Sequence, residues 1–493
     1  MTSYDVIVVG AGNAALCAAI SAQEQGSRVL VLEKGPIEKR GGNSFFTDGA
    51  IRVGYNNFDA IKTIIDLDEE TSNKIKMPNY SPQDFYDDIM RVSQNQSKPE
   101  LIEKLVTQSL PTIEWMKSHG VNFELNYANQ SFEKEGKIEF WGGLPIKTVE
   151  KGIGLMRSLF NRCEQLGIDV WYEAAAKKIV TENNEVTALE VSTNEGIQRI
   201  ACQSVVLACG SLEADKKKRA EALGEEWNAA LIRGTEFNTG DGIDMAIEVG
   251  AQKFGQYDGC HAIGTDANAP RVGDFQKPGD IYKKHSYPYS VMVNVDGNRF
   301  VDEGADFRNY TYAKYGKEVL KQPKSIAFQI YDAKVRPILR EEYNLEEATI
   351  LEAETLEELA SKIDINQEQF LQTLKEYNAA VQEGLFNPSE KDGKGTTGIT
   401  PPKSNWAQTI SEGPFYACPV TCGITFSFGG LAATPNGEVL HENGEKIEGL
   451  FAAGEMIGGI FYENYPGGSG LMSGSVFGKL AGKSAATHAQ AIK

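Results

Sequence analysis

The chain has 493 residues, 41% of them hydrophobic, and a formal net charge of −19. This length exceeds what one simple core accommodates, so two or three domains are expected. The negative charge argues against nucleic acid and anionic membrane surfaces as partners, and no apolar stretch reaches membrane-spanning length.

An apolar strand opens the chain. Residues 4–9 form an apolar run rich in β-branched residues, which is typical of a buried parallel strand. Because the strand begins so early, no room is left for a signal peptide, and we expect a cytoplasmic protein. Gly10 permits the tight turn out of the strand, Gly12 lets a pyrophosphate approach the backbone, and Ala15 allows close helix–strand packing.

A helix and a second strand follow at the spacing of a dinucleotide-binding unit. The helix, from residue 14 to about 25, offers free N–H groups and the positive end of its dipole to phosphates. The strand at 28–32 ends at Glu33, about 20 residues past the glycines, where an acid is expected to meet a ribose hydroxyl. The combination predicts dinucleotide binding, and a glycine-rich turn in an ordinary α/β domain is the alternative.

Helices and short strands alternate through the middle of the chain. Ser81 is a predicted N-cap, with Pro82 at the first helical position. We expect helices within 81–120 and at 148–167, and strands at 169–173, 174–181, 185–192, 198–201 and 204–210.

The composition changes at about residue 257. From there to 418 the chain is richer in Tyr, Lys and Glu, with helices predicted at 351–363 and 366–383, and we interpret this stretch as an inserted second domain. The βα pattern resumes at 449–455, and a small-residue helix at 473–491 closes the chain. The nucleotide-binding domain is therefore predicted to be discontinuous.

The seven cysteines are odd in number and scattered. No CxxC motif and no Cys/His zinc spacing occurs, so we expect no metal site and free thiols in a reducing compartment. A disulfide between Cys418 and Cys422 is the alternative. The cysteines are Cys17, Cys163, Cys202, Cys209, Cys260, Cys418 and Cys422.

Several motifs together resemble the FAD-dependent fumarate reductase/succinate dehydrogenase flavoprotein superfamily. The resemblance covers most of the chain, is closest to the soluble tricarballylate dehydrogenase-like members, and includes one segment similar to ketosteroid dehydrogenases. The motifs, in chain order, are Gly10-Ala11-Gly12, Glu33-Lys34, Gly41-Gly42-Asn43-Ser44, 206–210, 239–242, 296–303, 451–455 and 467–471.

The resemblance implies FAD as the cofactor and a large set of residues around it. Asp241 and Glu455 would accept hydrogen bonds from ribityl or ribose hydroxyls, and the segment 468–471 would place the positive end of the last helix at the flavin. The cofactor-binding residues implied are Gly10, Gly12, Asn13, Ala14, Ala15, Glu33, Lys34, Gly41, Gly42, Asn43, Ser44, Gly49, Ala176, Ala208, Cys209, Gly210, Asp241, Gly454, Glu455, Ser469, Gly470 and Leu471.

The implied fold is α/β. A discontinuous Rossmann-like FAD-binding domain of the glutathione-reductase type would comprise residues 1–256 and 420–493, with a helical insertion at about 55–150. An inserted α+β capping domain, at 257–419, would cover the substrate.

Three residues are the catalytic candidates that the resemblance implies. Arg299 would protonate the substrate carbon, although an ion pair with Asp302 or Glu303 is the alternative. His261 would hold a substrate carboxylate, or be a plain polar residue of the cap. Tyr465 would polarise the activating group of the substrate, with a buried packing role as its alternative.

The substrate segment departs from the fumarate reductase pattern. Asn464-Tyr465 stands where that family has Asn-Arg, and residues 423–427 contain no histidine, so fumarate and succinate are disfavoured. Tyr465 followed by Pro466 is similar to the ketosteroid dehydrogenase segment, in which a tyrosine hydroxyl and a glycine N–H bind a carbonyl oxygen. Expected substrate residues are Arg308, Tyr310, Gly467 and Gly468, and the wider set of aromatic and basic cap residues is Tyr282, His285, Tyr287, Tyr289, Arg308, Tyr310 and Tyr312.

The predicted function is FAD-dependent addition or removal of two hydrogens across a C–C bond beside a carboxylate or carbonyl. A ketosteroid dehydrogenase or enone reductase acting on an apolar ketone is one alternative, and a flavin electron-transfer subunit of a larger complex is the other. The partners expected are a small-molecule substrate and an external electron donor or acceptor.

Overall fold

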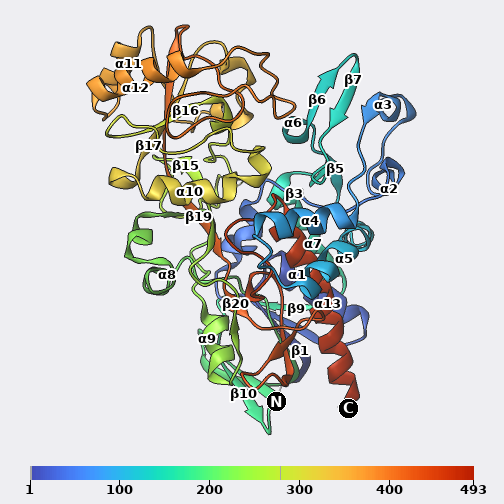
Figure 1. Cartoon of the computed structure of the whole chain (residues 1–493). Coiled ribbons are helices and arrows are strands. Elements are labelled where there is room, and N and C mark those ends of the chain that lie inside the picture. Colours follow the sequence, from blue (N-terminus) through green and yellow to red (C-terminus); the bar gives the residue numbers. More distant parts are fainter. Residues whose placement is uncertain (1–2, 278, 493) are drawn as a thin grey trace.

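The largest sheet joins the two ends of the chain. The computed structural model describes residues 3–277 and 279–492 (Figure 1). The sheet has eight strands in the order β10-β11-β22-β12-β1-β2-β9, with β21 paired to β22. The strands are β1 (Ser3–Val9), β2 (Val29–Leu32), β9 (Asp169–Trp171), β10 (Ala175–Glu182), β11 (Glu185–Thr193), β12 (Gly196–Leu207), β21 (Glu438–Leu440) and β22 (Lys446–Ala452).

The parallel strands at the centre of this sheet end at one edge. β1 pairs in parallel with both β12 and β2, so that Val9 lies opposite Leu207 and Leu32. β22 continues the edge, with Ala452 opposite Leu207. Because these strands are covered on both faces, their sequences are continuous apolar runs, as predicted for residues 4–9. The residues that follow the strands therefore gather at the carboxyl edge of the sheet.

Two helices from opposite ends of the chain pack side by side on the sheet. α1 (Asn13–Glu24) and α13 (Ser469–Ala491) lie together in Figure 1. The approach is close, since a Cβ atom at Gly478 would overlap the carbonyl oxygen of Ala14. The small residues of α13 thus allow this C-terminal helix to pack closely against α1, next to the N-terminal strand–turn–helix unit.

The chain between β2 and β9 forms further helices and short strands, and part of this region, including residues 58–76 and 127–140, projects at the upper right of Figure 1. α4 begins with the predicted Ser81 cap: Ser81 Oγ accepts from the Asp84 N–H, and the Asp84 carboxylate accepts from the Ser81 N–H. The elements here are α2 (Phe58–Lys62), α3 (Glu69–Lys74), α4 (Pro82–Val92), α5 (Pro99–Ser118), α6 (Tyr127–Gln130), α7 (Lys151–Gln165), β3 (Ala50–Ile51), β4 (Ile75–Lys76), β5 (Phe123–Leu125), β6 (Ser131–Lys134), β7 (Lys137–Phe140) and β8 (Ile146–Thr148).

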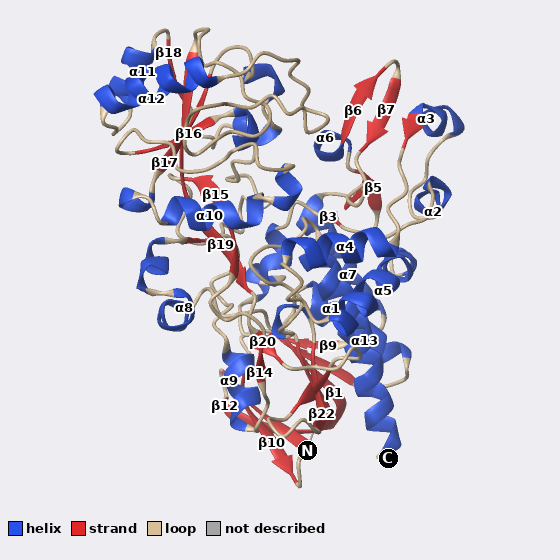
Figure 2. Ribbon diagram, viewed as in Figure 1, coloured by secondary structure: helices blue, strands red, loops and turns tan. Residues whose placement is uncertain are grey.

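A second, six-stranded sheet organises the upper left of the molecule (Figure 2). Its central strand, β19, pairs with β13, β15, β17 and β18, and β16 pairs with β17. The sheet and its neighbours comprise β13 (Leu231–Ile232), β15 (Cys260–Asp266), β16 (Val291–Asn294), β17 (Ala327–Tyr331), β18 (Leu351–Ala353), β19 (Phe415–Ser427), α10 (Tyr312–Leu320), α11 (Leu356–Lys362) and α12 (Gln367–Ala380).

The mixed α/β fold is confirmed, with differences in detail. The predicted helix at 351–363 begins with strand β18, because Leu351 and Ala353 pair with β19, and α11 starts only after the Thr355 cap. The two strands predicted at 198–201 and 204–210 are one strand, β12. β19 runs through residue 420, and the division into domains at 256–257 and 419–420 stays a prediction.

The cysteines and the helices bear on two further expectations. All seven cysteines are free, and the suggested pairing of Cys418 with Cys422 is wrong because both lie four residues apart on the extended strand β19. Across the described residues, every helix is too short or too polar to cross a membrane.

Candidate functional site

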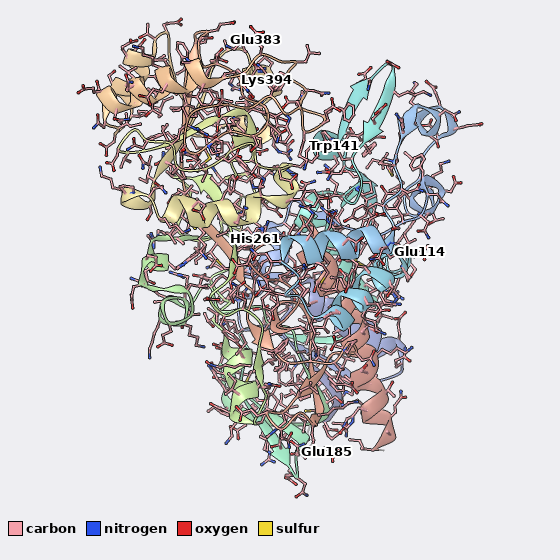
Figure 3. All side chains as sticks on the ribbon, in the orientation of Figure 1. Glu114, Trp141, Glu185, His261, Glu383 and Lys394 are labelled. Atoms are coloured by element: carbon pink, nitrogen blue, oxygen red, sulfur yellow. The ribbon has the colours of Figure 1, made fainter. Side chains whose placement is uncertain are left out.

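One large cavity lies where the carboxyl edge of the eight-stranded sheet meets the second sheet. It runs from the end of β2 past the N-terminus of α1 to the N-terminus of α13, and continues beneath α10. Figure 3 places His261, a residue of its wall, at this junction. Segments distant in sequence therefore share one elongated site.

The end of the cavity nearest β2 has the chemistry of a dinucleotide site. Gly12, Asn13 and Ala14 line it where α1 begins, and the N-cap residue, Gly12, has no side chain that could cap this helix end. The Asn13 N–H donates to Ser44 Oγ at 3.1 Å, which holds the 41–44 loop against the helix. Uncapped N–H groups and the positive helix end favour a diphosphate here. Glu33, at the end of β2, lines the same end, and burial raises its pKa.

Lys34 and Asp241 line the cavity as a pair. Lys34 Nζ lies 2.9 Å from Asp241 Oδ2, and the Thr239 hydroxyl, which Lys34 also contacts, donates to Asp241 Oδ1 at 2.9 Å. These two hydrogen bonds to Asp241 and the charge of Lys34 hold the pKa of Asp241 below its usual range, against the effect of burial. Asp241 is therefore ionised and partly neutralised, so it accepts hydrogen bonds without presenting an isolated charge.

A second helix N-terminus meets the other part of the cavity. Gly468 is the N-cap of α13, and it lines the cavity with Gly470 and Leu471. Glu455 also lines the cavity and accepts from the Ser211 N–H at 3.1 Å. Burial and the neighbouring buried Glu213 raise the pKa of Glu455 well above its ordinary value. Ionisation of each glutamate therefore disfavours ionisation of the other.

Most of the cofactor residues expected from the sequence line this one cavity. Ala15, Gly41, Gly49 and Ser469 do not belong to its wall within the described chain. Those that line it are Gly10, Gly12, Asn13, Ala14, Glu33, Lys34, Gly42, Asn43, Ser44, Ala176, Ala208, Cys209, Gly210, Asp241, Gly454, Glu455, Gly470 and Leu471.

An aromatic group forms the wall beneath α10. The Tyr312 and Tyr465 hydroxyls are 2.7 Å apart, and the His261 ring stacks on Phe426 with centroids 5.4 Å apart. His261 also meets the edges of Tyr312 and Tyr465, at 5.2 and 4.7 Å. All four residues line the cavity. Since one tyrosine hydroxyl donates to the other, one phenolic proton of the pair is left for a further acceptor.

His285 and Arg308 stand beside this wall. Arg308 Nη1 lies 3.3 Å from His285 Nδ1. A guanidinium only donates, so Nδ1 accepts and the proton of the neutral imidazole is on Nε2. His285 Nε2 is buried with no hydrogen-bond partner in the described structure. Burial, reinforced by the charge of Arg308, lowers the pKa of His285 well below its usual range. An unused N–H donor is thus present at the site.

His261 has a similar orphaned nitrogen. Its Nδ1 lies 2.7 Å from the Thr425 hydroxyl oxygen, which also receives a hydrogen bond from Arg233. In the tautomer in which the Thr425 hydroxyl donates to Nδ1, the imidazole proton is on Nε2. His261 Nε2 is buried and likewise finds no partner among the residues described. Burial and the Arg233 charge lower the pKa of His261 well below its usual range.

Arg299 is not at this site, which corrects the expectation for it. Its guanidinium donates to Glu303 Oε2 at 2.6 Å and to the Pro401 carbonyl at 2.6 Å, and it does not belong to the cavity wall of the described chain. Glu303 is fully buried, so the pair neutralises a charge in the interior of the protein. The structure thus contains the ion pair with Glu303 that is the alternative interpretation of Arg299.

The other substrate candidates divide between the cavity and its surroundings. Arg308, Gly467 and Gly468 line the cavity, as do His285 and Tyr312 of the wider aromatic and basic set. Tyr310 lies outside, where its hydroxyl donates to Asp88 at 2.8 Å. Tyr282, Tyr287 and Tyr289 are also not wall residues within the described ranges.

Sequence reasoning missed Arg233 and Asp280. Both line the cavity, and Arg233 Nε donates to Asp280 Oδ1 at 2.8 Å, so its charge is neutralised in place. Arg233 follows the apolar pair of β13 and precedes a glycine, and a charged residue at the end of a buried strand was the available signal. Asp280 lies in a loop that carried no such signal.

Comparison with known proteins identifies one family and several relatives. The family model described as "FAD binding domain" matches residues 5–471. An NADH:fumarate oxidoreductase of Klebsiella pneumoniae is 27% identical over 506 residues; the match covers 99% of this chain and 48% of that protein, so the chain spans about half the length of this relative. A vinyl phenol reductase of Lactiplantibacillus plantarum is 25% identical over 525 residues, covering 99% of this chain and 98% of that protein.

Solved structures show the same fold. The open conformation of a flavocytochrome c3 fumarate reductase superposes with a TM-score of 0.74 at 26% identity, covering 99% of this chain and 79% of that one. A 3-ketosteroid Δ1-dehydrogenase from Sterolibacterium denitrificans, in complex with 1,4-androstadiene-3,17-dione, superposes with a TM-score of 0.76 at 19% identity, covering 99% and 100% of the two chains. The latter likeness concerns the fold alone.

Proposed function

Because this chain belongs to the FAD-binding domain family and takes FAD as its cofactor, we propose that it is an oxidoreductase acting on a C–C bond beside a carboxylate or carbonyl. The relatives named above, which are an NADH:fumarate oxidoreductase and a vinyl phenol reductase, support this reaction class. The observation that carries the proposal is the convergence of Arg308 with the orphaned Nε2 atoms of His261 and His285 on the FAD-binding cavity.

The fit to FAD rests on two helix ends that meet one cavity. The N-terminus of α1 would hold the diphosphate, and that of α13 would lie at the flavin ring, with Glu33 and Glu455 toward the ribose and ribityl hydroxyls. Bound FAD supplies the transfer of two electrons with hydrogen to or from the substrate carbon.

Two imidazole N–H groups and a phenol hold the activating group of the substrate in this proposal. His261 and His285 are neutral donors, and the free proton of the Tyr312–Tyr465 pair is a third. Neutral donors suit the oxygen of a carbonyl or carboxylate on which negative charge builds up during the reaction, since they stabilise it without repelling a nearby cation. Each would otherwise remain an unsatisfied buried donor, which costs roughly 1–3 kcal/mol.

Arg308 is the proton donor that we propose in place of Arg299. Its hydrogen bonds go to His285 Nδ1 at 3.3 Å and Asn309 Oδ1 at 2.7 Å, both neutral groups. Among the described residues no carboxylate forms an ion pair with it, and it lines the cavity. Withdrawal from bulk water, reinforced by the charge of Arg340, lowers the pKa of Arg308 to about 10. A guanidinium ordinarily holds its proton too tightly for acid catalysis, and this shift brings the pKa closer to the working range.

A ketone substrate is the second candidate. The Tyr465 hydroxyl with the N–H of Gly467 or Gly468 would form a pair of donors for a carbonyl oxygen, and all three residues line the cavity. The Gly467 N–H already donates to the Asn309 carbonyl at 3.1 Å, which favours Gly468 for this role.

The external partners are also part of the proposal. Electrons would reach or leave FAD through a separate donor or acceptor, and the working compartment would be the cytoplasm, in which seven free thiols persist.

Anaerobic reoxidation of the reduced flavin tests the function. FAD bound to the enzyme is reduced with dithionite and mixed with fumarate, cis-aconitate or an enone steroid, and the oxidised-flavin absorbance is followed. We expect reoxidation by at least one of these and none by its saturated analogue (succinate, tricarballylate or the saturated ketone). Reoxidation by oxygen alone, with all conjugated compounds inert, would contradict the proposal and favour a flavin electron-transfer subunit.

A further inference from the structure

A carboxylate outside the cavity connects the helical region to the substrate end of the site. Asp88 of α4 accepts from the Tyr80 hydroxyl at 2.7 Å and from the Tyr310 hydroxyl at 2.8 Å. Arg91 lies 3.3 Å from it and Arg52 lies 3.6 Å from it. We refer to these five residues as the Asp88 cluster. None of them belongs to the cavity wall in the described part of the molecule.

Arg52 ties the cluster to the loop before α13. Its side chain is fully buried, and Nε donates to the Gly467 carbonyl at 2.8 Å. Its backbone N–H donates to the Gly468 carbonyl at 3.2 Å. Both glycines line the cavity, and Gly468 caps α13. Arg52 therefore anchors both peptide carbonyls of this loop, one through its side chain and one through its backbone.

Tyr310 ties the cluster to the segment that carries Arg308. Arg308, Asn309 and Tyr310 form the 3₁₀ turn η5 (Arg308–Tyr310), so the Tyr310 ring is one end of the turn and Arg308 the other. The Asn309 carbonyl accepts from the Gly467 N–H at 3.1 Å, and the Tyr310 carbonyl accepts from Asn464 Nδ2 at 2.6 Å. The turn and the loop are thus joined to each other and to Asp88.

Electrostatic interactions couple the residues of the Asp88 cluster, so each one stabilises the others. Arg52 is a buried cation that would be costly without a nearby anion, and Asp88 supplies it. The Arg52 guanidinium also lies over the Tyr80 and Tyr310 rings, at 5.4 and 5.5 Å from their centroids. Burial raises the pKa of Tyr80 and of Tyr310, so both phenols stay protonated and donate to Asp88.

We propose that Asp88 is a positioning residue that holds Arg308 and the Gly467–Gly468 loop at the substrate end of the cavity, acting through Tyr310 and Arg52. The proposal rests on the proposed function for the roles of Arg308 and the loop. The placement of the two segments does not depend on it. A displacement of a reacting group by about 1 Å can lower a rate by about a hundredfold, so loss of this anchor should be visible in turnover.

The test is Tyr310→Phe. This substitution removes one hydroxyl from the Asp88 cluster and keeps the aromatic ring over which the Arg52 guanidinium lies. The chain offers a matched control in Tyr4→Phe: Tyr4 donates to Asp169 at 2.8 Å and has Arg28 over its ring at 4.5 Å, and Tyr310 donates at 2.8 Å and has Arg91 over its ring at 4.6 Å. Tyr4 lies on β1, at the far edge of the sheet from the cavity.

Two measurements are made on the FAD-loaded enzymes. Hydrogen–deuterium exchange should be faster in Tyr310→Phe than in Tyr4→Phe at residues 306–312 and 464–468. The limiting rate of flavin reoxidation by the acceptor should fall about tenfold in Tyr310→Phe and stay within twofold in Tyr4→Phe, with equal FAD content and with less change in the half-saturating concentration.

Unchanged exchange at both segments would overturn the proposal, and so would faster exchange with an unchanged limiting rate. If the wild-type enzyme is reoxidised by no conjugated acceptor, the proposed function fails by itself. The exchange measurement then decides whether Asp88 positions these segments.

Discussion

Two arginines separated by nine residues have opposite environments in this protein. Arg299 is enclosed by Glu303 and three backbone carbonyls, and Arg308 faces the cavity with neutral partners. A guanidinium paired with a buried carboxylate has its donors occupied, so it holds the fold together. A guanidinium at a cavity with neutral neighbours keeps donors for a substrate. The partner of each arginine therefore decides its role.

Substituting each arginine by methionine should separate the two roles. Arg308→Met should lower turnover about 10²-fold or more while FAD content and Tm change little, since a positioned acid contributes about 10²–10⁴-fold. Arg299→Met should lower the free energy of unfolding by about 3–5 kcal/mol, because Glu303 is left buried and unpaired, with kcat per bound FAD within about threefold.

The measurements are steady-state turnover normalised to bound flavin and thermal unfolding of both variants. A loss of turnover in Arg299→Met that exceeds the loss in Arg308→Met would return the catalytic role to Arg299.

At the scale of elements, the turn from β1 into α1 shows why its two glycines are not equivalent. Gly10 has φ +105°, and a Cβ there would lie 2.8 Å from Cys209 Cα and closer still to the Ala208 oxygen. Gly12 has φ −84°, and a Cβ there would meet its nearest atoms, of Ser44 and Gly41, at 3.6 and 3.7 Å. The fold itself requires glycine at position 10. At position 12 the protein leaves room for a Cβ atom. The close approach of a ligand is therefore the remaining reason for glycine at this position.

Alanine at each position tests this distinction. Gly12→Ala should fold with an unchanged Tm in the FAD-free state but retain little FAD, because the new methyl group occupies the approach of the diphosphate. Gly10→Ala should lower the free energy of unfolding by about 1–3 kcal/mol even without FAD, because of backbone strain and the overlap with Ala208. FAD content after gel filtration and unfolding of the FAD-free proteins are the readouts. Full FAD retention by Gly12→Ala would place the diphosphate elsewhere.

For the whole molecule, the buried pair of Glu213 and Glu455 makes stability depend on pH. Burial raises the pKa of both carboxyl groups, so above the ordinary glutamate pKa of about 4.5 the folded state holds protons that the unfolded state has lost. Stability then falls as the pH rises from about 4.5 toward the raised pKa. The excess of acidic residues acts in the same direction, because self-repulsion grows as the net charge becomes more negative.

Glu455→Gln should flatten this pH dependence. Removing one titrating group takes away up to about 1.4 kcal/mol of stability change per pH unit within the window above pH 4.5. The slope of the unfolding free energy between pH 5 and pH 8 is measured by denaturant titration of the FAD-loaded protein. Glu383→Gln, on the exposed surface, is the control and should keep the wild-type slope. An equal slope in Glu455→Gln and the wild type would mean that Glu455 titrates no differently in the folded and unfolded states.

The sequence by itself determined the parts of this protein that depend on local pattern. The buried strands, the Ser81 cap, the glycine turn at residues 10–12 and the acid at residue 33 follow from periodicity and from backbone requirements within a few residues. Their joint order also led to the FAD-binding family, and most of the cofactor residues predicted from it line the one large cavity.

The tertiary structure decided which charged and aromatic side chains meet. Arg299 and Arg308 lie on the same stretch of sequence, and only long-range packing paired the first with Glu303 and the Pro401 carbonyl and turned the second toward His285. Likewise, Arg233 reaches the site through β13, whose pairing with β19 joins residues almost 200 positions apart. The energy of a buried charge depends on its neighbours in space, and sequence periodicity carries no record of neighbours that distant.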